Sequence, residues 1–312
     1  MPSRLRRLAD SAYERLLARE INGAPRHVAV IQDGNRRYAS ERGSEATAGH
    51  RAGAATTEAV LDWCEEFGVE ELTLYAFSTE NFERPPEERE AIFDLIETKL
   101  REFADAERVH EAAVEIRAIG EIERLPERVR RAIRYAEGRT RGYDRLRLNV
   151  ALAYGGRAEL LGAARDIARA VERGELAPEE IDAATVESRL RGGATRDVDL
   201  IIRTGGDERT SNFLPWHANG NEAAAFFCTP YWPAFRKVDF LRAIRTYESR
   251  EKSWRRTRAR RALALVRALG RAELDEARAV LRRLRGHLPR GELDGLDGFD
   301  DGFDAEAAPT TE

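Results

Sequence analysis

Residues 27–35 read HVAVIQDGN, an apolar run that changes within a few residues into a polar turn. Residues 28–31 are Val, Ala, Val and Ile, which favours a buried strand, and the Asp33-Gly34 pair favours a sharp turn after it. Helical patterns separate most of the five further segments that have the pattern of strands: 71–78, 114–120, 146–154, 197–206 and 223–228. The sequence therefore predicts an α/β fold, a single domain with a largely parallel six-stranded sheet flanked by helices.

The helices are indicated by apolar periodicity and by signals at their ends. An Ala-rich helix over 47–67 should stop at Gly68, because glycine tolerates the left-handed conformation at a helix end. Pro85 and Pro86, followed by acidic residues, predict the start of a helix that runs to about Val109. Further helices are expected at 4–20, 125–138, 157–173, 178–191 and 236–285.

Charge is divided unevenly along the 312 residues, although 52 Lys+Arg and 56 Asp+Glu leave a net charge of only −4. Residues 286–312 contain eight acids and one arginine, a net −7, so residues 1–285 carry +3. The acidic tail is of low complexity and is expected to be disordered. Only three of the basic residues are lysine: Lys99, Lys237 and Lys252.

Several classes of protein are disfavoured by the sequence. No run approaches the ~20 apolar residues of a membrane span, and the N-terminus has neither the apolar core nor the cleavage site of a secretory signal. The two cysteines, Cys64 and Cys228, are far apart, which argues against a disulfide framework and a cysteine-rich zinc site. We therefore expect a protein of the reducing cytoplasm.

Three polar clusters follow predicted strands: 33–37, 78–84 and 203–211. In a parallel sheet, ligands bind beyond the carboxyl ends of the strands, so the clusters are expected to converge. The sequence contains neither GxGxxG nor the lysine-bearing P-loop pattern, which disfavours ordinary dinucleotide and nucleoside triphosphate sites. Arginines around a carboxylate, without a catalytic Ser-His-Asp or Cys-His set, indicate a site for one or two diphosphates and a metal ion.

The first cluster, DGNRR at 33–37, has the chemistry of a phosphate site. Gly34 permits a turn, the backbone N–H groups after it can hold an anion, and two arginines add forked donors. Asp33 would repel a bare phosphate, so a Mg²⁺ ion must bridge the carboxylate and the phosphate oxygens. An ordinary Asp-Gly turn beside solvated arginines is the alternative for this segment alone.

The other two clusters also have structural alternatives. Residues 78–85 combine hydroxyl groups, Asn81 and Arg84 at a strand-to-helix junction, where an N-cap and a turn would use the same residues. In 203–212, arginines and Ser211 surround a diglycine that suits a phosphate group, and a surface turn is the alternative.

Several long segments resemble the cis-prenyltransferases, the undecaprenyl or dehydrodolichyl diphosphate synthase family. They are HVAVIQDGNRRYASERG from residue 27, LTLYAFSTENFERPPEE from 72, LNVALAYGGR from 148, DLIIRTGGDERTSNFLPWHANGNEAAAFF from 199 and WPAF from 232. The likeness covers about residues 25–255 in the right order. The domains expected from it are an N-terminal helix at 1–24, a catalytic domain at 25–255, an Arg-rich helical extension at 256–285 and an acidic tail at 286–312.

The resemblance implies a homodimeric, Mg²⁺-dependent prenyltransferase. Isopentenyl diphosphate would be added repeatedly, each new double bond being cis, to an allylic diphosphate, either geranylgeranyl or farnesyl diphosphate. The product would be a long, undecaprenyl-like polyprenyl diphosphate, the precursor of a glycosyl carrier lipid. Such a product needs an apolar tunnel, and the side chains that could line it from the helix after Pro86 are Phe93, Ile96, Leu100 and Phe103.

The resemblance also implies roles for individual residues. Asp33 matches a catalytic Mg²⁺ ligand and Asn81 a participant in proton removal, while Glu222 matches a second Mg²⁺ ligand that acts across the dimer. The residues that match substrate-binding positions are Gly34, Asn35, Arg36, Arg37, Tyr38, His50, Ser78, Thr79, Glu80, Phe82, Arg84, Arg203, Arg209, Thr210 and Ser211.

Three features depart from the family pattern. Ala46 stands where many bacterial members have an arginine, so one diphosphate contact is missing or comes from Arg42 or Arg51. Residues 219–221 are Asn-Gly-Asn where apolar or aromatic residues are usual, which affects the expected dimer contacts. The Arg-rich ending of the family is followed here by a further helical extension.

Other functions are open to this sequence. A non-catalytic partner subunit of the same fold would lack the aspartate that Asp33 supplies. The basic residues of 250–285 could bind nucleic acid or an anionic membrane, but RNA-binding and zinc-finger signatures are absent from the sequence. We expect no nucleic acid partner and keep peripheral contact with a membrane as an option. The lysine-poor, acid-tailed composition suggests a salt-adapted archaeal source, for which geranylgeranyl diphosphate is the expected primer.

Overall fold

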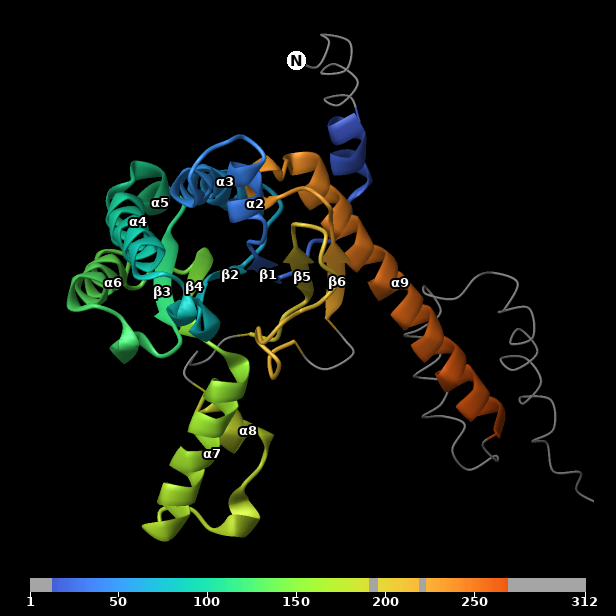
Figure 1. The fold of residues 1–312 in the computed structure, drawn as a ribbon. Coiled ribbons are helices and arrows are strands. Elements are labelled where there is room, and N and C mark those ends of the chain that lie inside the picture. Colours follow the sequence, from blue (N-terminus) through green and yellow to red (C-terminus); the bar gives the residue numbers. More distant parts are fainter. Residues whose placement is uncertain (1–12, 191–195, 219–222, 269–312) are drawn as a thin grey trace, which may run out of the picture. The chain divides into compact units, whose positions relative to one another are not determined.

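The computed structural model describes residues 13–190, 196–218 and 223–268, and Figure 1 shows its fold. The chain divides into two compact units, residues 1–247 and 248–312. The sheet and the three polar clusters all belong to the first unit.

One six-stranded sheet, in which every neighbouring pair of strands is parallel, organises the first unit. The segment 197–206 forms a shorter strand than expected, because Gly205 and Gly206 have φ angles of 87° and 83° and turn the chain after Arg203. The predicted α/β fold with a six-stranded sheet is confirmed. The strand order is β3-β4-β2-β1-β5-β6, with β1 (His27–Ile31), β2 (Glu71–Ser78), β3 (Val114–Ile119), β4 (Leu146–Tyr154), β5 (Leu200–Arg203) and β6 (Ala224–Phe227).

Helices connect the strands, and two of them differ from the sequence prediction. The helix expected from Pro86 to Val109 is interrupted at Ala106, whose extended backbone separates α4 from α5. The helix expected at 178–191 is a 3₁₀ turn and a short helix, because Asp182 accepts a hydrogen bond from the backbone N–H of Thr185 and starts a new helix. The helices are α2 (Asn35–Ser40), α3 (Ala46–Glu66), α4 (Pro86–Asp105), α5 (Glu107–Glu111), α6 (Glu127–Arg139), α7 (Gly156–Glu172), α8 (Ala183–Glu187) and α9 (Lys237–Ala268), with 3₁₀ turns η1 (Thr79–Glu83), η2 (Ile122–Arg124), η3 (Pro178–Glu180) and η4 (Trp232–Ala234).

Apolar side chains cover both faces of the sheet. On one face, residues such as Leu72 and Phe77 pack with residues of α3, α4 and α6. On the other face, Ile201 and Phe213 belong to a smaller cluster, in which Tyr75 stacks on Phe213 with 4.5 Å between ring centroids. Figure 1 shows α3 above the row of strands and α7 with α8 below it. Burial on both faces explains why the strands have apolar runs rather than strict alternation.

Near the amino ends of the strands, buried polar side chains form a hydrogen-bonded ladder across the sheet. His27 Nε2 lies 2.8 Å from Thr73 Oγ1, and Asn149 Nδ2 donates to Thr73 Oγ1 at 3.1 Å and to Glu71 Oε1 at 2.6 Å. Thr73 and Asn149 are partners in the pairing of β2 with β4. Because a buried polar group without a hydrogen bond costs free energy, the ladder favours this register over a shifted one.

Helix α9 starts in the first unit, where Phe240, Leu241 and Ile244 are buried. None of the helices in the described ranges combines the length and the apolar character needed to cross a bilayer. Residues 13–20 of the expected helix at 4–20 are helical, and the start of that helix, residues 269–285 and the acidic tail lie outside the described residues.

Replacement of Asn149 by alanine is expected to lower the free energy of unfolding by about 2–4 kcal/mol, because the buried Glu71 carboxylate loses its 2.6 Å donor. The midpoint of denaturant-induced unfolding, followed by circular dichroism, measures this loss. Asn22→Ala, at an exposed position, is the matched control and should change the free energy by less than about 0.5 kcal/mol. Equal losses in the two variants would show that the ladder does not stabilise the sheet.

Candidate functional site

The candidate site lies where the order of the strands changes direction. From β1 the chain continues to β2 on one side, whereas β5 lies on the other side of β1 and is followed outward by β6. Such a reversal leaves a crevice beyond the carboxyl ends of the two central strands. Asp33 follows β1 and Thr204 follows β5, so the first and third polar clusters meet in this crevice.

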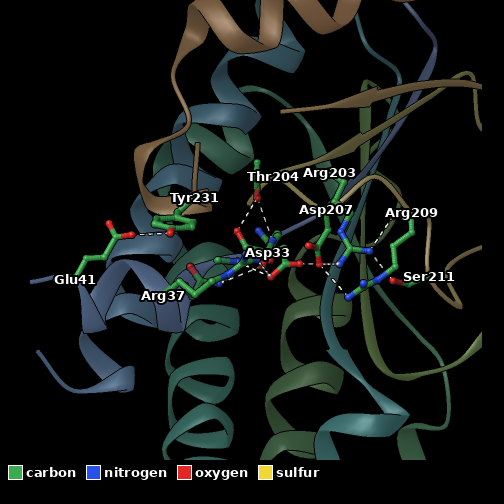
Figure 2. Close-up of polar contacts among 12 residues, drawn as sticks. Asp33, Arg37, Glu41, Arg203, Thr204, Asp207, Arg209, Ser211 and Tyr231 are labelled. Carbon is green, nitrogen blue, oxygen red and sulfur yellow. Dashed lines mark hydrogen bonds and ion pairs between the residues drawn. The ribbon is translucent and has the colours of Figure 1, made fainter. Parts of the chain in front are cut away.

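Asp33 is held between β1 and β5 by hydrogen bonds (Figure 2). Its Oδ2 accepts from Arg203 Nη2 at 2.7 Å, and its Oδ1 accepts from Arg37 Nη2 at 3.1 Å. Thr204 Oγ1 accepts from the Asp33 N–H at 3.0 Å and donates to the Asp33 carbonyl at 2.8 Å. Burial by itself raises the pKa of Asp33, but the hydrogen bond and charge of Arg203, with the charge of Arg37, outweigh it and hold the pKa below its usual value. The carboxylate is therefore ionised at neutral pH.

Arg203 organises the other half of the crevice (Figure 2). Its side chain is only 4% exposed, and its Nη2 also donates to Asp207 Oδ2 at 3.0 Å. Its Nη1 donates to Ser211 Oγ at 2.6 Å and to the carbonyl of Arg209 at 2.8 Å. The exposed Arg209 guanidinium lies 2.9 Å from Asp207. Arg203 Nε is buried and has no hydrogen-bond partner within the described residues.

Glu88, near the start of α4, gathers three basic side chains from α2, α3 and the loop before α4. Its Oε1 accepts from Arg84 Nη1 at 2.7 Å and lies 3.6 Å from Arg36 Nε and 3.9 Å from His50 Nε2. Burial lowers the pKa of His50 to about 4; the charges of Arg84 and Arg36 act in the same direction and Glu88 opposes them. The imidazole is therefore neutral at neutral pH. Its buried Nε2 has no hydrogen-bond partner in the part of the chain that the structure describes.

Asp33, Arg36, Arg37, His50 and Arg84 line a pocket of about 770 Å³, which we call the anion pocket. Glu88 and Arg203 hold some of these side chains from outside its wall. Gly34 has a φ of 96°, and a Cβ atom there would lie 2.5 Å from the Tyr231 ring, so the turn before α2 requires glycine. Asn35 Oδ1 is buried without a partner among the described residues. The charged and polar residues in the lining of the pocket suit an anionic ligand and are Asp33, Asn35, Arg36, Arg37, His50 and Arg84, together with Gly34.

Neither Arg42 nor Arg51 is among the residues of the anion pocket, although each was a candidate to replace the arginine missing at Ala46. The guanidinium of Arg42 lies 3.6 Å from the centre of the Tyr38 ring, and Arg51 lines a groove between α3 and α4. Arg36 lines the pocket instead, and its side chain is 61% exposed. An exposed arginine can turn toward an incoming anion at little cost.

The anion pocket opens into a second cavity of about 180 Å³, which we call the apolar channel. Gln32, Asn35, His50 and Arg84 line both and mark its mouth. Of the four side chains expected in a tunnel, three are present in the channel wall, whereas Phe93 packs in the core against Phe77. Asn81 also lines the channel. The apolar side chains beyond the mouth are Leu74, Ala76, Ile92, Leu95, Ile96, Leu100, Phe103, Ile116, Leu148, Val150 and Trp232.

Nine of the candidate residues that the structure describes lie outside the walls of these two cavities. Asn81 Oδ1 accepts the N–H of Ser78 at 3.0 Å, which ties the end of β2 to η1, and Phe82 packs edge-on against Phe77. Glu222 lies outside the described residues. The nine residues are Tyr38, Ser78, Thr79, Glu80, Phe82, Arg203, Arg209, Thr210 and Ser211.

Three residues of the site were not identified from the sequence. Glu88 and Asp207 each stand four residues after an arginine that they contact, Arg84 and Arg203, and this spacing was a usable signal. From the sequence alone, Glu88 is an ordinary acidic residue in the first turns of a helix. Thr204 has no local signal, because its bonds to Asp33 join residues 171 positions apart.

The donor set suits a Mg²⁺ ion that is shared with a phosphorylated ligand. Asp33 and Asp207 both contact Nη2 of Arg203, so two carboxylates lie close together. Across the described ranges, no three His, Cys, Asp or Glu side chains gather into a metal cage. Mg²⁺ commonly uses one or two carboxylates and completes its shell with water and phosphate oxygens, so the residues present fit such an ion.

Comparison with known proteins agrees with this geometry. The family model described as putative undecaprenyl diphosphate synthase matches residues 31–255. The chain is 69% identical over 297 residues to a tritrans,polycis-undecaprenyl-diphosphate synthase (geranylgeranyl-diphosphate specific) of Haloarcula marismortui, with 95% of this chain and 98% of that protein covered. A protein with the same description from Halobacterium salinarum is 70% identical over 289 residues, with 93% and 95% covered.

A solved structure has the same fold. The lavandulyl diphosphate synthase from Lavandula x intermedia, in complex with dimethylallyl diphosphate, matches with a TM-score of 0.67 and 34% identity. The match covers 72% of this chain and 95% of that one. The parallel sheet, the arginines at its switch point and these relatives lead to one conclusion: the chain belongs to the undecaprenyl diphosphate synthase family of prenyltransferases.

Proposed function

We propose that this prenyltransferase is a Mg²⁺-dependent cis-polyprenyl diphosphate synthase that extends geranylgeranyl diphosphate with isopentenyl diphosphate to an undecaprenyl-length product. The observation that carries the proposal is the anion pocket opening directly into the apolar channel. An allylic diphosphate has a charged head and an apolar tail, and this pair of cavities matches both. The relatives from Haloarcula marismortui and Halobacterium salinarum, both described as geranylgeranyl-diphosphate specific, support the choice of primer over farnesyl diphosphate.

In this proposal the allylic diphosphate occupies the anion pocket with its tail in the channel. Gly34, Asn35, Arg36, Arg37, His50 and Arg84 would hold the diphosphate, and the neutral His50 adds a hydrogen bond without adding charge. Isopentenyl diphosphate would bind on the other side of Asp33. Its diphosphate would contact Arg203, Arg209 and Ser211, of which Arg203 donates hydrogen bonds to the other two.

The reaction then breaks the bond between C1 and oxygen of the allylic substrate, and diphosphate leaves with the electron pair. C4 of isopentenyl diphosphate bonds to C1, and a proton is lost from C2. The arginines around the leaving group stabilise its developing charge because they are in place before reaction. A bound Mg²⁺, held by Asp33, would neutralise part of that charge. Asn81 lines the channel near its mouth and is the proposed participant in proton removal.

The proposed assembly is a homodimer in which Glu222 of each chain adds a second Mg²⁺ ligand across the interface. Residues 1–24 and 256–312 stay outside the proposed catalytic domain, which runs over 25–255. We also propose peripheral contact with a membrane, because the apolar product must pass into lipid. A non-catalytic partner subunit is disfavoured by the ionised Asp33 at the switch point.

The purified protein is expected to elongate geranylgeranyl diphosphate when supplied with Mg²⁺ and radiolabelled isopentenyl diphosphate. Product length is read by chromatography of the dephosphorylated chains. The ratio kcat/KM should be higher for geranylgeranyl than for farnesyl diphosphate, and chelation of Mg²⁺ with EDTA should stop the reaction. Absence of elongation with every allylic primer would overturn the proposed function.

Replacement of Asp33 by alanine is expected to reduce kcat by at least about 10³-fold, which corresponds to about 4 kcal/mol of lost transition-state stabilisation. The steady-state rate of elongation at saturating substrates measures it. Asp182→Ala, an exposed aspartate at the start of α8, is the control and should retain activity. Substantial turnover by the Asp33 variant would remove this residue from its proposed role.

Arg36→Ala is expected to raise KM for the allylic diphosphate about tenfold, equivalent to about 1.4 kcal/mol, because one charged donor to phosphate is lost. Arg42→Ala is the matched control, since its guanidinium lies on Tyr38 outside the pocket. Initial rates at varied primer concentration separate the two. A larger effect at Arg42 than at Arg36 would assign the missing family contact to Arg42 instead.

A further inference from the structure

Helix α2 carries two arginines of the anion pocket, although little within the helix itself holds it in place. It has only 6 residues, and Gly34 at its N-cap provides no side-chain hydrogen bond. Helices this short are marginal in water, so α2 depends on contacts with other parts of the chain. The directions of Arg36 and Arg37 are therefore set by whatever fixes α2 from outside.

The segment that follows β6 supplies such contacts. The N–H of Trp232 donates to the Asp33 carbonyl at 2.9 Å. The Pro230 carbonyl accepts from the N–H of Gly205 at 2.8 Å. These backbone bonds tie the segment to the turn after β1 and to the turn after β5. The residue between the two bonds, Tyr231, is thereby held at the place where the first and third polar clusters meet.

Tyr231 contacts both ends of α2, and Figure 2 shows it beside Glu41 and Arg37. Its ring lies against Gly34, where a Cβ atom would be only 2.5 Å from the ring. Its hydroxyl donates to Oε1 of Glu41, the C-cap residue, at 2.6 Å. One side chain thus spans the helix from the turn before it to the residue after it.

The ring of Tyr231 also holds the guanidinium of Arg37. The Cζ atom of Arg37 is 5.4 Å from the ring centre, which is within the range of a cation–π contact. The Arg37 side chain is 45% exposed, and among the described residues the one hydrogen-bond partner of its guanidinium is Asp33. Asp33 is also the proposed Mg²⁺ ligand, so its carboxylate is shared. The contact with the Tyr231 ring does not depend on that carboxylate.

We propose that Tyr231 is a positioning residue that aims Arg37 at the allylic diphosphate. The inference rests on the proposed function. Tyr231 is outside the lining of the anion pocket, so it acts through Arg37 and not on the substrate. Because the ring holds the guanidinium before the substrate arrives, the arginine loses less conformational entropy on binding. A donor fixed in advance also stabilises the charge that develops on the leaving diphosphate.

Binding of geranylgeranyl diphosphate in the absence of isopentenyl diphosphate tests the proposal, because no condensation follows. Calorimetric titration gives the Kd. Tyr231→Leu is expected to raise the Kd about threefold to fivefold, the loss typical of one exposed cation–π contact. Tyr231→Phe loses the bond to Glu41 but keeps the ring, so its Kd should stay within about twofold of the natural value. Tyr231→Met has no aromatic face and takes the place of the leucine variant if that variant is unstable.

A double-mutant cycle separates the positioning of Arg37 from a general structural effect. Arg37→Ala alone should raise the Kd about tenfold, because one charged donor to phosphate is lost. In that background Tyr231→Leu should add no further loss, since the ring has no guanidinium to hold. Independent losses at the two positions would overturn the proposal.

The second substrate provides a further readout. In Tyr231→Leu the KM for isopentenyl diphosphate should stay unchanged, because that substrate is assigned to the cluster at 203–211. An equal rise in KM for both substrates would mean that the whole site is damaged, which is incompatible with a role limited to Arg37. Circular dichroism checks that each variant is folded.

Tyr135 is the matched control, because it makes the same two kinds of contact. The Cζ atom of Arg101 lies 5.5 Å from its ring centre, and its hydroxyl donates to Asp105 Oδ1 at 2.6 Å. It belongs to α6 and is outside the lining of both cavities. Tyr135→Leu should leave the Kd unchanged, and an effect as large as that of Tyr231→Leu would refute the role of Tyr231. Failure of the natural chain itself to elongate any primer would instead count against the proposed function.

Discussion

The ion pair between Asp33 and Arg203 is the contact on which the site depends. It joins residues 170 positions apart, and it forms because β1 and β5 are parallel neighbours with Ile31 opposite Arg203. Parallel pairing brings the carboxyl ends of both strands to one edge of the sheet, and the change of direction in strand order leaves that edge open at this point. The bonds of Thr204 to the backbone of Asp33 then hold the two strand ends at a constant separation.

The same contact prepares the pocket for a diphosphate. Arg37 and Arg203 lie on either side of Asp33, whose negative charge offsets their mutual repulsion before a ligand arrives. Binding of an anion exchanges existing hydrogen bonds for new ones instead of ordering mobile side chains, so less conformational entropy is lost. Preorganised donors of this kind also stabilise the charge that develops on a leaving group.

Helix α4 runs from the anion pocket, where the diphosphate head group would bind, along the apolar channel, where the tail would lie. Glu88 gathers the basic residues of the anion pocket, and the spacing of three and four residues places Ile92, Leu95 and Lys99 along the same side of the helix. The same helix thus contacts a basic residue at the mouth and lines the apolar channel.

Much of the fold was readable from local patterns. The apolar runs at 27–31 and 146–154 predicted buried strands, and both are strands in the structure. The position of DGNRR after the first run also placed Asp33 at a strand end. The errors were at boundaries that depend on single backbone angles, as at Ala106, or on a side-chain cap, as at Asp182. Periodicity does not report either of these.

The sequence by itself determined the strands, the helices and the polar clusters at the strand ends, because apolar periodicity and turn chemistry act over a few residues. Only the tertiary structure decided which clusters touch. It brought Asp33 to Arg203, set Arg36 in the anion pocket in place of Arg42, and placed side chains of α3, α4 and the sheet around one apolar channel. These relations depend on strand order and helix packing, which follow from burial over the whole chain and have no local signature.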